Sequence, residues 1–112
     1  MILKGSVVVK PHNNIIEGIA YVDPFCENLP NHPSEKILIC KRVNLDYIEK
    51  ILQFKCVVTS FGGLLSHASI IFRELNFPSI VGVENADTVI KTGDKLVINF
   101  EDGTIQVHEG GE

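Results

Sequence analysis

One histidine, His67, lies in a setting that suits phosphoryl chemistry. It follows a glycine pair, Gly62-Gly63, and a serine, Ser66, and it precedes a segment of good helix formers. Glycine allows positive φ and lets a bulky anion approach without meeting a Cβ. The first turn of a helix has amide groups without an intrahelical partner, and the helix dipole adds partial positive charge there. We therefore expect a phosphate to be favoured beside this histidine.

The same setting favours a nucleophilic ring. The helix dipole opposes protonation of His67, and the neutral imidazole is the form that attacks phosphorus. Once the ring holds a phosphoryl group, the new negative charge lies where the backbone donors already point. Phosphoryl transfer depends mainly on positioning and charge stabilisation, so this geometry would favour both the reactive ring and its product.

The flanking sequence predicts the elements that hold this histidine. The apolar run Cys56 to Ser60 predicts a buried strand that leads into the glycine turn. A helix is expected from about Ser66 to Leu75, with Ser66 as its cap and Pro78 ending it. Ser79 to Val83 predicts the next strand.

The new helix should bury one face. Its apolar stripe is predicted to consist of Ile70, Ile71 and Leu75, with His67 at the exposed beginning. Arg73 lies too far around the helix to reach a phosphate on His67, and it is expected to form a salt bridge or to contact a docked domain.

The rest of the chain alternates strand and helix patterns, which predicts an α/β fold with mixed sheets. The stretch from 23 to 34 reads as an irregular loop, and 109–112 as a frayed tail. Asn44 is expected to cap a helix over 45–53, and 84–90 to hold a short helical turn. The remaining strands are predicted at 2–10, 15–22, 36–40, 95–100 and 104–108.

Length and composition exclude several classes of protein. The 112 residues suit one domain, 1–112, and 45% apolar with 21% charged residues is ordinary for a globular chain. A net charge of −4 argues against nucleic acid or an anionic membrane as partner, and no apolar run approaches the ~20 residues of a membrane span. Three widely spaced cysteines, Cys26, Cys40 and Cys56, suit buried thiols in a reducing cytoplasm better than disulfides or a zinc site.

The stretch from Thr59 to Gly82 resembles a family signature. It is similar to the mobile phosphohistidine domain of phosphoenolpyruvate-utilising enzymes, a family that includes pyruvate phosphate dikinase, phosphoenolpyruvate synthase, enzyme I and rifampicin phosphotransferase. The chain departs from the family pattern at Leu65, Phe72 and Asn76-Phe77. The matching positions are Thr59, Gly62, Gly63, Ser66, His67, Ala68, Ile70, Ile71, Arg73, Glu74, Leu75, Pro78 and Gly82.

This resemblance implies a swivelling three-layer β/β/α domain whose His67 is transiently phosphorylated. The donor and acceptor would be ATP or a related nucleotide, phosphoenolpyruvate, pyruvate or another small molecule. The implied partners are an ATP-grasp nucleotide-binding domain and a phosphoenolpyruvate- or pyruvate-binding domain, in the same chain or in another. No cofactor is expected on this domain, and Mg²⁺ is expected on the partner domains.

The remaining site residues have alternative roles. Gly62 and Gly63 are predicted to let the phosphate approach rather than to form only a tight turn. Ser66 is predicted to cap the helix or to donate to the phosphoryl oxygens. Thr59 is equally suited to bonding a phosphate oxygen and to ending its strand.

Three functions are compatible with the sequence. The first is a phosphoryl carrier, which is part of a phosphotransferase and not a complete enzyme alone. The second is a non-catalytic docking or regulatory module of the same fold, which exposed Phe72 and Phe77 would suit. The third, a hydrolase that uses Ser66, is disfavoured because Ser66 lacks the Gly-x-Ser-x-Gly setting.

Overall fold

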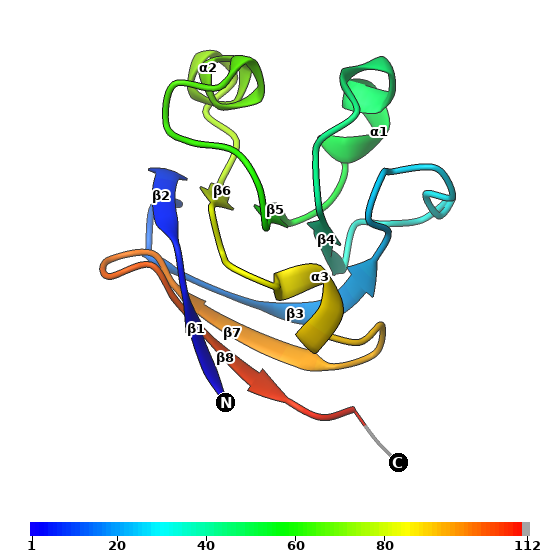
Figure 1. Ribbon diagram of the computed structural model, residues 1–112, viewed down its shortest axis with the longest axis vertical. Coiled ribbons are helices and arrows are strands. Elements are labelled where there is room, and N and C mark those ends of the chain that lie inside the picture. Colours follow the sequence, from blue (N-terminus) through cyan, green and yellow to red (C-terminus); the bar gives the residue numbers. More distant parts are fainter. Residues whose placement is uncertain (111–112) are drawn as a thin grey trace.

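The computed structural model describes residues 1–110, and in this part of the chain eight strands form one mixed sheet (Figure 1). The strand order is β1-β8-β7-β3-β4-β5-β6-β2. The strands are β1 (Ile2–Lys4), β2 (Ser6–Val9), β3 (Ile15–Val22), β4 (Lys36–Cys40), β5 (Cys56–Thr59), β6 (Ser79–Val81), β7 (Lys95–Asn99) and β8 (Thr104–His108). The helices are the 3₁₀ turn η1 (Leu45–Tyr47), α1 (Ile48–Ile51), α2 (His67–Glu74) and α3 (Ala86–Val89).

The first strand expected from the sequence, Ile2 to Lys10, is wrong as one element, because the chain divides at Gly5 into β1 and β2. β1 pairs with β8, whereas β2 pairs with β6 at the opposite end of the strand order. Gly5 therefore joins the two edges of the sheet, which curls round on itself. A Cβ on Gly5 would lie 2.4 Å from Cγ2 of Val83 and 2.8 Å from the carbonyl oxygen of Val81. The bend consequently needs a residue without a side chain.

Two apolar cores lie on the two faces of the central strands. Alternate residues of β4 show this division, since Ile37 and Ile39 join the first core whereas Leu38 and Cys40 join the second. The first core fills the space between β1-β8-β7-β3 and β4-β5-β6-β2. The second lies under α1 and α2, which cover the outer face in Figure 1. The layers are thus β, β and α, which confirms the fold that the resemblance implied.

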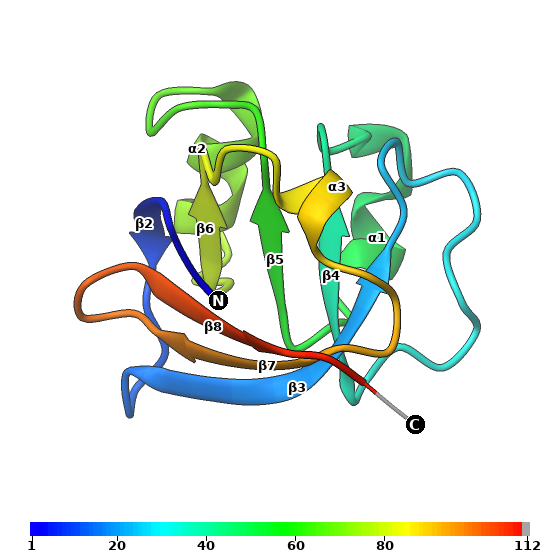
Figure 2. The same cartoon turned by 60° about the horizontal axis from the view of Figure 1, so that its bottom comes forward.

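The middle of the sheet is parallel. β3, β4, β5 and β6 pair in the same direction, so β4, β5 and β6 end at one edge (Figure 2). Cys40, Thr59 and Val81 are the last residues of those strands. In sheets of this kind the loops that follow the carboxyl ends of the strands meet and build the ligand sites.

Many of the predicted elements have the bounds that the sequence indicated. Residues 15–22, 36–40 and 104–108 form β3, β4 and β8 as expected, and Asn44 caps η1 by accepting a bond from the Asp46 amide. The helix expected over 45–53 is shorter, because a 3₁₀ turn precedes the single α-turn of α1. The tail expected at 109–112 lies partly outside the described residues. Within it, Gly110 donates a hydrogen bond to Asp94.

The predicted apolar stripe of α2 is wrong. Ile70 and Leu75 are 44% and 53% exposed, whereas Phe72 and Ser69 are fully buried. The helix is short and carries apolar side chains on two faces, so its pattern does not identify the face that meets the sheet. Phe72 packs in the second core with Leu38 of β4 and Val57 of β5, and this burial against the sheet fixes which face of the helix turns inward.

The three cysteines are buried free thiols, as expected. Burial raises the pKa of the Cys56 thiol well above its ordinary value, because the thiolate would lose its hydration. None of the helices within residues 1–110 is long and apolar enough to cross a membrane.

We predict that Gly5→Ala destabilises the fold by about 1–3 kcal/mol, the usual cost of forcing an atom into packed surroundings. Urea unfolding followed by circular dichroism measures the loss. Gly63→Ala is the control, because a Cβ at Gly63 meets nothing within 4 Å. A Gly5→Ala protein as stable as the control would show that the bend tolerates a side chain.

Candidate functional site

His67 lies at the carboxyl edge of the parallel strands, beside a cavity of about 410 Å³. Residues from three segments far apart in the sequence meet there: the loop after β4, the loop between β5 and α2, and the end of β6. The lining residues are Arg42, Val43, Leu45, Thr59, Phe61, Gly62, Ser66, His67, Ala68 and Val81. Four of the five predicted site residues are among them, and Gly63 lies next to Gly62 in the same loop.

The glycine pair has two different roles. Gly62 has φ +108°, a conformation that side chains rarely allow, whereas Gly63 has no positive φ. A Cβ at Gly63 would point into open space. Gly62 is therefore needed for the turn itself, and Gly63 leaves an open approach beside the histidine.

Thr59, the last residue of β5, makes two hydrogen bonds that hold this loop. Its side chain is buried, and its hydroxyl donates a 2.6 Å hydrogen bond to the Phe61 carbonyl oxygen. The Thr59 carbonyl accepts from the Val83 amide at 2.9 Å. Because the hydroxyl proton is already used, a direct bond from Thr59 to a phosphate oxygen would need this contact to break.

Ser66 caps α2. Its Oγ accepts from the Ser69 amide at 3.2 Å and donates to Ser69 Oγ at 3.0 Å. Ser69 Oγ in turn donates to the Gly63 carbonyl at 2.8 Å, and the Ser66 amide donates to the same carbonyl at 3.1 Å. This set of bonds ties the glycine loop to the first turn, and it confirms the expected cap.

The cap leaves two first-turn donors unused. The amides of Ser66 and Ser69 have partners, whereas those of His67 and Ala68 come too early in the helix to find one within it. The His67 side chain is exposed, and no acidic residue lies in the first turn. The beginning of α2 is thus open to an anion, with the imidazole next to it.

Arg42 is a cavity residue that the sequence analysis missed. It follows β4 by two residues, and its guanidinium lies 5.0 Å from the centre of the Phe61 ring. The signal that could have found it is the parallel order of β4 and β5, which brings the loops after both strands to one edge.

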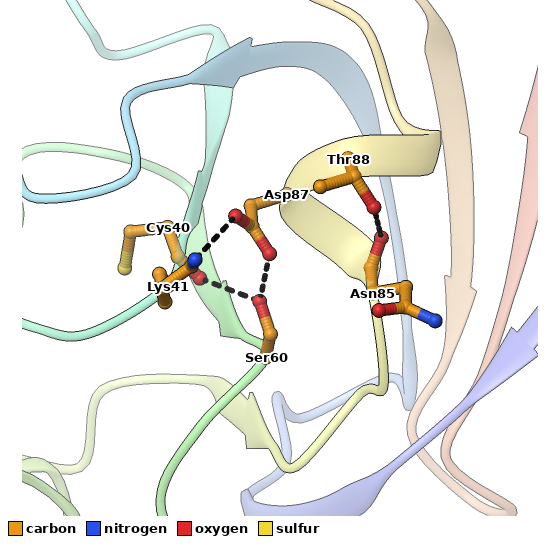
Figure 3. A network of polar contacts seen from close by, with 6 residues as sticks. All are labelled: Cys40, Lys41, Ser60, Asn85, Asp87 and Thr88. Carbon is orange, nitrogen blue, oxygen red and sulfur yellow. Dashed lines mark hydrogen bonds and ion pairs between the residues drawn. The ribbon is translucent and has the colours of Figure 1, made fainter.

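The preceding lysine, Lys41, lies over the same Phe61 ring, 5.8 Å from its centre, and it also has an acidic partner. Lys41 Nζ pairs with Asp87 of α3 at 3.9 Å, and Ser60 donates to the same carboxylate and to the Cys40 carbonyl (Figure 3). The Asp87 side chain is only 6% exposed. This cluster ties α3 to the ends of β4 and β5, the two strands that lead into the cavity loops.

Exposed apolar side chains surround the histidine. Phe61, Leu64, Leu65 and Ile70, here called the apolar rim, are 43–85% exposed. The expectation that Phe72 and Phe77 could form a docking face is wrong, since both are buried in the second core.

Among the described residues that line the cavity, His67 is the one histidine. Within residues 1–110 no three His, Cys, Asp or Glu side chains are grouped to hold a metal ion. His12, His32 and His108 are exposed, and none of them lines the cavity. Arg73, for which a salt bridge or a contact with a docked domain was predicted, donates to the Leu64 carbonyl and so braces the loop.

The chain is similar in sequence to parts of several longer, curated proteins. The chain is 35% identical over 95 residues to a probable phosphoenolpyruvate synthase of Staphylothermus marinus, covering 83% of this chain and 11% of that protein. It is 32% identical to rifampicin phosphotransferase of Bacillus subtilis, covering 92% of this chain and 12% of that protein. The chain thus spans about a tenth of the length of these curated relatives.

A solution structure of an Enzyme I protein superposes with a TM-score of 0.58 at 26% identity, covering 71% of this chain and 33% of that one. The family model described as "PEP-utilising enzyme, mobile domain" matches residues 32–103, which include the whole of the cavity and His67. That match covers more than half of the sequence, and the chain therefore belongs to the family of the PEP-utilising enzyme mobile domain.

Proposed function

We propose that this chain is a phosphoryl carrier in which His67 is transiently phosphorylated. It passes the group between a nucleotide or phosphoenolpyruvate site and a second acceptor site on partner domains or proteins. The observation that carries this proposal is the exposed His67 ring at the start of α2, next to two first-turn amides that the Ser66 cap leaves unused.

The transfer step follows from this geometry. A ring nitrogen lone pair of His67 attacks phosphorus in line, a nitrogen–phosphorus bond forms, and the donor oxygen leaves with the electrons of its bond. The phosphoryl oxygens then lie towards the amides of His67 and Ala68 and the helix dipole. Attack by an acceptor oxygen on the opposite side reverses the step and frees the ring.

Partner sites complete the reaction. The apolar rim suits a face that is covered during transfer, because water must be excluded from the reacting phosphoryl group. The much greater length of the relatives supports partner domains that supply the nucleotide and phosphoenolpyruvate sites. Mg²⁺ would be bound by those domains, since no three His, Cys, Asp or Glu side chains are grouped to hold a metal ion within residues 1–110.

We predict that the protein, incubated with a competent partner enzyme and labelled ATP or phosphoenolpyruvate, takes up a label that is labile in acid and stable in alkali. His67→Ala removes this label entirely, because no other histidine is among the described residues that line the cavity. His32→Ala is the control, as His32 is exposed and is not among the residues that line the cavity. If no competent partner labels the intact chain, the domain is a non-catalytic docking or regulatory module.

Replacing Ser66 separates its possible roles. Ser66→Ala should destabilise the protein by about 1 kcal/mol, the typical value of a helix cap, as measured by urea unfolding. Ser66→Thr keeps the hydroxyl and should retain most of the stability. Both variants still become phosphorylated on His67 at a reduced rate. Complete loss of labelling in Ser66→Ala, together with inhibition of the natural protein by serine-directed reagents, would instead support a serine hydrolase.

A further inference from the structure

Arg42 is the only permanently charged side chain among the residues that line the cavity beside His67, within the described part of the chain. The other lining residues are apolar or neutral apart from the histidine itself. Neither of the ion pairs found in residues 1–110 involves Arg42. Its five guanidinium donors are thus not held by a carboxylate, and they lie at the margin of a mostly apolar hollow.

The backbone holds Arg42 in this place. The amides of Lys41 and Arg42 both donate to the Pro24 carbonyl, at 2.7 and 3.2 Å. The Phe61 amide donates to the Lys41 carbonyl at 3.0 Å, so the loop after β4 is tied to the loop that leads to His67. These bonds limit the movement of the Arg42 main chain relative to the glycine turn.

The side chains of Lys41 and Arg42 both lie over the Phe61 ring, 5.8 and 5.0 Å from its centre, but they differ in their other partners. Lys41 forms an ion pair with Asp87, as Figure 3 shows, whereas Arg42 lines the cavity and has no ion pair within residues 1–110. The aromatic face restricts the guanidinium without using its hydrogen-bond donors, since a cation over a ring is held by the ring's quadrupole. Arg42 is exposed, and the donors of its guanidinium remain open to an anion at the cavity.

The geometry points to Arg42 as the residue that binds the phosphoryl group of phosphorylated His67 and offsets its charge. This inference rests on the proposed function. A phosphoryl group on a side chain carries roughly −1.5 to −2 charges at neutral pH, and the amides of the first turn supply only partial charges against it. A planar guanidinium matches two phosphoryl oxygens at once. Arg42 would add the full positive charge that the beginning of α2 lacks.

The first test uses the full chain with His12, His32 and His108 replaced by glutamine, so that phosphoramidate can label only His67. The pH titration of the phosphoryl group is followed by ³¹P NMR.

Because a nearby cation favours the dianion, Arg42→Gln should move the titration midpoint upward by about 0.5 pH unit. Arg42→Lys keeps the charge and should move it less. Lys41→Gln removes an equal charge at the adjacent position outside the cavity, and should leave it near the value of the parent protein.

The second test needs no phosphorylation. Inorganic phosphate is titrated into the unmodified full chain, and the ring resonances of His67 report binding. Arg42→Gln should weaken phosphate binding about tenfold, the size of one charge-assisted hydrogen bond, and Lys41→Gln should not. Equal effects of the two variants in both tests, or none from Arg42→Gln, would overturn the assignment of Arg42. Arg42-dependent phosphate binding without transfer from any partner enzyme would leave the anion site standing and overturn the carrier function.

Discussion

The site depends on the hydrogen bonds between the Ser66–Ser69 pair and the Gly63 carbonyl. They close the first turn of α2 onto the glycine loop while leaving the amides of His67 and Ala68 unused. An acidic residue in this turn would neutralise the positive end of the helix, and none is present. A histidine at this position therefore stands next to donors that are open to water or to an external anion.

The sheet makes this arrangement stiff. β5 leads directly into the glycine loop, and it is an inner strand of the parallel group, with β4 and β6 as neighbours. Its residues are completely buried between the two cores. The Thr59 hydroxyl donates to the Phe61 carbonyl at the start of the loop, and the Val83 amide donates to the Thr59 carbonyl. Chemistry that relies on positioning needs support of this kind below the reacting ring.

The surroundings of the ring are open and mostly apolar. In the proposed carrier function this is a consistent combination, because a group that travels between sites must be accessible in solution and covered during transfer. In that function the apolar rim would supply surface for the covering partner, and Arg42 would supply the charge that the domain carries with it. The Lys41–Asp87–Ser60 cluster keeps the other nearby cation bound to α3.

The amino-acid sequence by itself determined the local elements and the histidine motif. The bounds of β3, β4 and β8, the Ser66 cap and the exposed His67 follow from signals that reach only a few residues along the chain. A cap needs a hydroxyl near an amide three residues later, and a strand needs an apolar pattern, so both can be identified without knowing the fold.

Only the tertiary structure decided the division at Gly5, the buried face of α2 and the place of Arg42. The bend at Gly5 comes from pairing with both β8 and β6, two strands far away in the sequence. α2 has apolar side chains on more than one face, and burial of Phe72 in the core that Leu38 and Val57 of the sheet share selects one of them. Arg42 lines the same cavity as His67 because β4 and β5 are parallel neighbours, a pairing that no local pattern contains.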